Sequence, residues 1–142
     1  MPDSAQAHGP TRRGAVTPLL QIDRLSHITL IVSDLARANS FYGGFLGLPP
    51  IQRPHADVQV AYYRCGDAEV HLLVAEEHPR PTRRHIAFEV SDFDRVLKSI
   101  DGEWVRIVGG PGTRRSDGGR FVFVQDPDGN LIEITCPPAP DP

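Results

Sequence analysis

Nearly the same twelve residues occur twice in this 142-residue chain, and both copies begin with histidine. The first copy, HITLIVSDLARA, starts at His27, and the second, HIAFEVSDFDRV, starts at His85, which is 58 positions later (85 − 27 = 58). In each copy an alternating, largely apolar segment predicts a β-strand, and the Ser-Asp pair behind it is typical of a helix N-cap. A chain that repeats a strand and a capped helix in this way is expected to fold as two similar modules.

Each predicted helix is followed by segments that alternate in the manner of strands. In the first half these segments lie near residues 50–53, 58–65 and 69–75, and in the second half they read EWVRIV, RFVFVQ and NLIEIT, with a glycine-rich loop at 109–119. The sequence therefore predicts an α+β fold of two tandem βαβββ modules, residues 22–76 and 83–136, in one domain that spans 22–136. Residues 1–21 and 137–142 lack periodicity or are rich in proline, so we expect a disordered arm and tail.

Four polar side chains occupy matched positions in the two modules. His27 and His85 open the first strands, and aligning the last strands, EVHLLV and LIEITC, pairs His71 with Glu133. Side chains alternate between the two faces of a strand, which places all four residues on the face away from the helices. If the modules pack about a pseudo-two-fold axis, the four side chains converge.

Three imidazoles and one carboxylate are suitable ligands for a divalent first-row metal ion, and such a set leaves coordination positions open. A single strand histidine is often a hydrogen-bonded interior residue, but four symmetry-matched polar residues favour a metal site. We expect one divalent ion of Fe, Mn, Co, Ni or Zn, bound by His27, His71, His85 and Glu133. For His71 the pattern leaves two roles open, a fourth ligand or an uncoordinated base.

Three segments, HITLIVSDLARANSFYGGFLGL, RRHIAFEVSDFDRV and RFVFVQDPDGNLIEI, resemble the vicinal oxygen chelate superfamily. This superfamily includes glyoxalase I, extradiol dioxygenases, fosfomycin-resistance enzymes, methylmalonyl-CoA epimerase and bleomycin-binding proteins. The resemblance covers about residues 22–136, and it implies paired modules that form an open eight-stranded barrel around one metal ion. It also implies ligands at His27, His85 and Glu133, with His71 where the glyoxalase-I-like branch commonly has glutamate.

The resemblance implies electrophilic chemistry, in which the metal ion stabilises an enolate or oxyanion of the substrate. We therefore expect a glyoxalase-like lyase or isomerase that acts on a small oxygen-chelating substrate. The first alternative is an Fe(II)-dependent dioxygenase of the same fold, although Phe123 stands where extradiol dioxygenases carry tyrosine. The second alternative is a resistance protein that binds an antibiotic or toxin. Glu133 and His71 are the expected catalytic residues, and Glu69 and Glu89 are either further candidate bases or solvated charges.

Further residues on the same strand faces are candidates for substrate binding, although sheet packing is an alternative role for the aromatic ones. These candidates are Thr29, Tyr62, Arg64, Phe121 and Phe123. Arg114 and Arg115 lie in the glycine-rich loop, which either closes over an anionic substrate or forms a solvated hairpin.

The net charge of −3 argues against nucleic-acid binding, and no apolar run reaches the length of a membrane span. Two cysteines, Cys65 and Cys136, do not make a disulfide framework, so we expect a cytoplasmic protein. Prolines between the modules favour an extended path. That path suits modules exchanged between two chains, an arrangement that the resemblance also implies. We therefore expect a homodimer, and leave the exchange of modules open.

Overall fold

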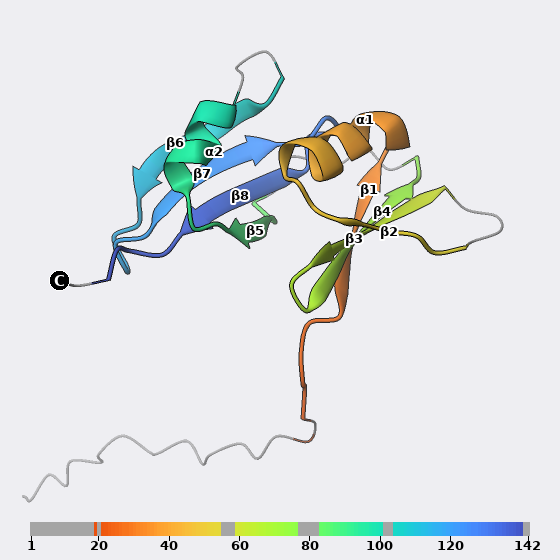
Figure 1. The fold of residues 1–142 in the computed structure, drawn as a ribbon, viewed down its shortest axis with the longest axis horizontal. Helices are drawn as coiled ribbons and strands as arrows, with labels where there is room; N and C mark the ends of the chain where they lie inside the picture. The colour runs from red at the N-terminus through yellow and green to blue at the C-terminus, as the bar shows by residue number, and fades with distance from the viewer. Residues whose placement is uncertain (1–18, 20, 55–58, 77–82, 101–103, 141–142) are drawn as a thin grey trace, which may run out of the picture.

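The computed structural model describes residues 19, 21–54, 59–76, 83–100 and 104–140. The element order confirms the predicted βαβββ pattern in both halves (Figure 1). Module one consists of β1 (His27–Val32), α1 (Leu35–Asn39), the π-helical turn η1 (Ser40–Phe45), β2 (Pro50–Ile51), β3 (Val60–Cys65) and β4 (Ala68–Val74). Module two consists of β5 (Ile86–Glu89), α2 (Phe93–Ser99), β6 (Arg106–Thr113), β7 (Arg120–Gln125) and β8 (Leu131–Cys136).

The two sheets have the same topology. Their strand orders are β1-β4-β3-β2 and β5-β8-β7-β6, with the first and last strands of each module parallel and the other neighbours antiparallel. Thr29 is the register partner of His71, and Ala87 is the register partner of Glu133. Since Thr29 and Ala87 are equivalent by the 58-residue repeat (87 − 29 = 58), His71 and Glu133 are equivalent as well. The structure thus confirms the predicted alignment of the last strands.

Aspartates cap both helices, as the Ser-Asp pairs predicted. The Asp34 carboxylate accepts a hydrogen bond from the backbone N–H of Arg37 at 2.7 Å, and that of Asp92 accepts one from Arg95 at 3.0 Å. An aspartate at this position satisfies a backbone donor that has no partner within the helix. The caps therefore fix where each chain segment turns from its first strand into its helix.

The core lies between each helix and the helix-facing side of its sheet. Full burial of one large apolar side chain contributes about 1.5–3 kcal/mol relative to exposure, so this layer supplies the main stabilising term. The largest fully buried side chains are Val32, Phe41, Tyr42, Leu72, Val105, Val122, Val124, Ile132 and Ile134. The opposite strand faces, which carry the candidate site residues, are left to face solvent or a partner.

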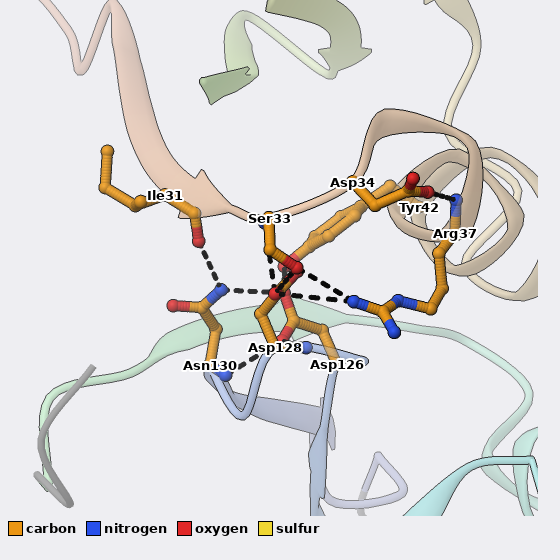
Figure 2. Close-up of polar contacts among 8 residues, drawn as sticks. All are labelled: Ile31, Ser33, Asp34, Arg37, Tyr42, Asp126, Asp128 and Asn130. Atoms are coloured by element: carbon orange, nitrogen blue, oxygen red, sulfur yellow. Dashed lines mark hydrogen bonds and ion pairs between the residues drawn. The ribbon is translucent and has the colours of Figure 1, made fainter. Parts of the chain in front are cut away.

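A hydrogen-bonded cluster joins the two modules, and we call it the module latch (Figure 2). The Tyr42 hydroxyl donates to the buried carboxylate of Asp126 at 2.8 Å, and the Asn130 amide donates to the backbone carbonyl of Ile31 at 3.0 Å. The Asp128 carboxylate accepts a hydrogen bond from the backbone N–H of Ser33 at 3.0 Å. These bonds dock the β7–β8 turn of module two on the β1–α1 junction and on η1 of module one.

The predicted eight-stranded barrel around one site is wrong for the single chain. The described strands form two separate four-stranded sheets, and no strand of one sheet pairs with a strand of the other. Figure 1 shows the module-two sheet at left and the module-one sheet at right, with α1 and η1 over their junction. Strand alternation predicts which side chains share a face, but contacts such as the module latch set how the two sheets are placed.

The predicted glycine-rich loop is also wrong over its first five residues. Residues 109–113 belong to β6, which pairs with β7 with two register irregularities. A Cβ at Gly109 would lie 3.3 Å from the Phe123 ring, and one at Gly112 would lie 3.1 Å from the Phe121 ring. The glycines therefore allow β6 to pass close to two large rings, and only residues 114–119 form a connecting turn.

Several predictions fall on chain segments outside this description. Residues 1–18 and 77–82, which hold most of the predicted arm and the proline-rich linker, are outside it, and residues 137–140 have no regular secondary structure. Within the described ranges, no helix is both long and apolar enough to cross a bilayer.

Candidate metal centre

His85 and Glu133 form a contact pair on the exposed face of the module-two sheet. His85 Nε2 lies 3.1 Å from Glu133 Oε2, and His85 Nδ1 lies 2.8 Å from the backbone carbonyl of Arg83. Since a carbonyl only accepts, Nδ1 donates to Arg83, and Nε2 is the ring nitrogen that faces the carboxylate and that a metal ion would bind. A backbone carbonyl that fixes the tautomer in this way is the usual support for a metal-binding histidine.

His27 and His71 form the corresponding pair on the module-one sheet. Their rings stack with centroids 4.2 Å apart and planes at 13°. The rings of Tyr62 and His71 pack edge to face, with centroids 4.7 Å apart. The lone pair of an imidazole nitrogen lies in the ring plane, so two nearly parallel rings do not aim at one point. One of the two rings has to turn before both can bind the same ion.

The four predicted ligands therefore lie as two pairs on two sheets, not as one cluster. Among the described residues, no group of three or more His, Cys, Asp or Glu side chains is close enough to hold a metal ion. Within the single chain the four candidate ligands therefore do not meet, because the two sheets do not face each other across a barrel. The site residues His27 and His85 remain exposed.

The chemistry and spacing of the module-two pair nevertheless fit a first-row metal ion. Two donors bound at right angles and at about 2.1 Å from one ion lie about 3.0 Å from each other. The 3.1 Å between His85 Nε2 and Glu133 Oε2 agrees with that separation. The donors, nitrogen and carboxylate oxygen, are those preferred by Fe, Mn, Co, Ni and Zn.

Glu69 has a defined place beside His71, which the sequence alone did not reveal. It forms two hydrogen bonds with Arg53 at 3.1 Å, an ion pair with Arg64 at 3.5 Å and a 2.7 Å contact with His71 Nε2. The hydrogen bonds from Arg53, followed by that from His71, lower the pKa of Glu69 to about 2. A carboxylate with so low a pKa is a weak proton acceptor, so Glu69 serves better to hold His71 than as a catalytic base.

The predicted substrate-binding aromatics lie beside the histidines. Tyr62 and Phe123 occupy equivalent register positions, opposite His71 and Glu133, and Phe123 meets the ring of His85 edge-on at 5.1 Å. A pocket of about 330 Å³ opens there, lined by Arg83, His85, Val108, Gly109, Phe123 and Leu131. Phe121 packs against Phe123 with ring centroids 5.7 Å apart, so it forms part of the same aromatic wall.

The remaining candidates are less central. Thr29 is exposed beside His71, and Arg64 is engaged by Glu69. Glu89 lies at the end of β5 and lines a different cavity of about 440 Å³, which also contains Cys65 and Arg95 and none of the predicted ligands. Glu89 is therefore poorly placed to act as a base at the candidate metal centre.

Arg114 lies in the connecting turn, as predicted, but its side chain is held by neighbouring groups. Its guanidinium forms a two-pronged pair with Asp117, at 3.0 and 2.9 Å, and Nη1 reaches Glu133 Oε1 at 3.5 Å and the hydroxyl of Thr135. The hydrogen bond from Arg114 lowers the pKa of Asp117 below its ordinary value. Arg114 is therefore directed at a candidate ligand, while Arg115 is exposed in the turn.

Comparisons with known proteins agree with this fold. The family model described as Glyoxalase/Bleomycin resistance protein/Dioxygenase superfamily matches residues 24–134. The glutathione transferase FosA of Serratia marcescens is 32% identical over 80% of each chain, and a lactoylglutathione lyase of Neisseria meningitidis is 28% identical over 78% of this chain and 88% of its own. A solved glyoxalase/dioxygenase from Nostoc punctiforme superposes with a TM-score of 0.73 at 30% identity, covering 88% of this chain and 100% of its own.

Proposed function

Because this chain belongs to the glyoxalase/bleomycin resistance protein/dioxygenase superfamily, we propose that it is a metal-dependent enzyme of the lyase or isomerase type. Its substrate would be a small molecule that presents one or two neighbouring oxygen atoms. The observation that carries this proposal is the pair of donors on module two, His85 Nε2 and Glu133 Oε2, 3.1 Å apart with the His85 tautomer fixed by a carbonyl.

His27, His85 and Glu133 would hold the ion, with His71 as a fourth donor or as the proton-transfer group. When bound, a divalent ion supplies stabilisation of the negative charge that develops on a substrate oxygen. Phe123 and Tyr62 provide apolar surface beside His85 and His71. The Glu69 carboxylate holds His71 Nε2 at 2.7 Å and so limits how that ring can turn.

The active form would be a homodimer in which module one of one chain meets module two of the other. Each sheet carries two of the four donors, and both donor pairs lie on faces that the single chain leaves open. Two chains related by a two-fold axis can each supply one sheet to each of two equivalent sites. This arrangement is the simplest way to unite His27 and His71 with His85 and Glu133 without disrupting the module latch.

Metal analysis of variants tests the proposal directly. Wild-type protein purified without added ions should contain close to one divalent ion per chain, and His27→Ala and Glu133→Ala should each lose it. Glu89→Ala removes an exposed carboxylate from module two, which also carries Glu133, and this variant should retain the ion. Full metal retention in both His27→Ala and Glu133→Ala would rule out the centre described here.

A substrate panel then separates the enzyme classes. Turnover of hemithioacetals of small thiols, without oxygen consumption, would support the lyase or isomerase. Oxygen uptake with a catechol by iron-containing protein would support the dioxygenase instead. Tight binding of an antibiotic by protein that contains no metal would support the resistance protein.

A further inference from the structure

The two oxygen atoms of Glu133 have different partners. Oε2 faces His85 Nε2 at 3.1 Å, and Oε1 lies 3.5 Å from Nη1 of Arg114. The Glu133 side chain is only 13% exposed, so protein groups surround most of it. One oxygen is thus engaged by a cation from a neighbouring turn, and the other is left beside the histidine.

Arg114 is itself held in place by several groups. Its Nε and Nη2 bind the two oxygens of Asp117, and Asp117 also accepts the backbone N–H of Gly119 at 3.0 Å. The Thr135 hydroxyl donates to the carbonyl of Arg120 at 3.1 Å, so its lone pairs are free to accept from Nη1 of Arg114. The guanidinium is therefore fixed in position and orientation before any ligand arrives.

The turn that carries Arg114 has the residues this placement requires. The backbone N–H of Arg114 bonds the carbonyl of Gly119 at 2.7 Å, and Gly118 adopts a φ of +75°, a conformation that favours glycine. A Cβ at Gly119 would collide with the guanidinium of Arg114 and lie 2.9 Å from the Cys136 carbonyl. The short residues of this turn therefore leave space for the guanidinium over β8.

We infer that Arg114 is a positioning residue for Glu133, which holds one carboxylate oxygen so that the other remains beside His85 as the donor to the metal ion. This inference rests on the proposed metal centre. A planar guanidinium suits the role because it spans Asp117, Thr135 and Glu133 at once, whereas an ammonium is a single point charge. Arg114 acts through Glu133 and need not contact the substrate.

The test is Co(II) affinity, measured by calorimetric titration of chelator-treated protein. Groups that orient a metal ligand typically contribute about 10- to 100-fold to affinity, so Arg114→Ala should bind Co(II) more weakly by about that factor. Arg114→Lys keeps the charge but not the fork, and it should also bind more weakly. Arg115→Ala removes the same charge from the same turn and should bind Co(II) as the wild type does.

A melting temperature close to that of Arg115→Ala would show that Arg114→Ala is folded, and a change in the visible Co(II) spectrum would show that its coordination is altered. Affinity of Arg114→Ala equal to or tighter than that of Arg115→Ala would overturn the inference, as would wild-type affinity in Arg114→Lys. If the wild-type protein itself takes up no Co(II), the proposed metal centre is refuted. If the wild type binds Co(II) and Arg114→Ala binds it equally well, only the role of Arg114 is refuted.

Discussion

Pairs of defective chains provide a direct test of whether the metal centre is assembled from two chains. His27→Ala disables the donors of module one and leaves module two intact, whereas Glu133→Ala does the reverse. Each variant alone should contain no complete centre. When the two variants are unfolded together and refolded, a mixed dimer combines the intact module one of one chain with the intact module two of the other.

The expected recovery follows from the distribution of donors over the two sheets. Random pairing makes about half of all dimers mixed, and a mixed dimer has one intact centre out of two, so metal content should return to about one quarter of the wild-type value. A centre completed within a single chain would show no recovery, because neither variant has intact donors in both modules.

The assay is metal content after gel filtration, with wild-type protein refolded in parallel. Refolding His85→Ala with Glu133→Ala is the matched control, since both changes disable module two and no combination is intact. Absence of recovery from His27→Ala with Glu133→Ala, while the refolded wild type regains its metal, would refute the two-chain arrangement. Equal recovery in the control mixture would refute it as well.

Three further predictions concern the fold. Tyr42→Phe removes the hydroxyl that donates to buried Asp126 and should lower the free energy of unfolding by about 1–3 kcal/mol in urea titrations. Burial and the Asp126 charge raise the pKa of Tyr42 above its ordinary 10.0. The stabilisation that comes from the Tyr42–Asp126 hydrogen bond is therefore present below pH 10 and should be lost as the pH rises above 10. Urea denaturation at stepped alkaline pH would show this loss. This alkaline loss should be smaller in Tyr42→Phe. Leu72→Ala, at a fully buried position, should cost about 2–5 kcal/mol by the same urea assay, and a loss below 1 kcal/mol would contradict the described core.

The repeated sequence predicted the modules well because alternation and caps are local properties. The strand-to-helix order and the Asp34 and Asp92 caps follow from residues close together in the chain. Comparing the two local patterns then gives the 58-residue spacing of His27 and His85 and the match of His71 with Glu133. Residues 109–113 were predicted wrongly, since glycine usually indicates a loop. Here Gly109 and Gly112 instead give space to the rings of Phe123 and Phe121 on the neighbouring strand, a contact that requires knowledge of the pairing.

For the candidate centre, the sequence could predict the donor residues but not their arrangement in space. Their residue types and shared strand face come from the sequence, but their grouping into two pairs depends on how the sheets are placed. The partners Glu69 and Arg114 were not predicted to hold ligands. Arg53, which binds Glu69, is sixteen positions away in the chain (69 − 53 = 16), and Arg114 reaches Glu133 across a hairpin, so neither contact has a signal in local spacing.

The module latch has a consequence for any assembly of two such chains. Its hydrogen bonds are directional, so they fix the angle between the two halves of each polypeptide as well as their contact. If each polypeptide lends one half to each of two catalytic centres, the distance between those centres is determined inside the polypeptides and not at the surface where they touch. A substitution at Tyr42 or Asn130 would then displace both centres together, even though neither residue lies at either one.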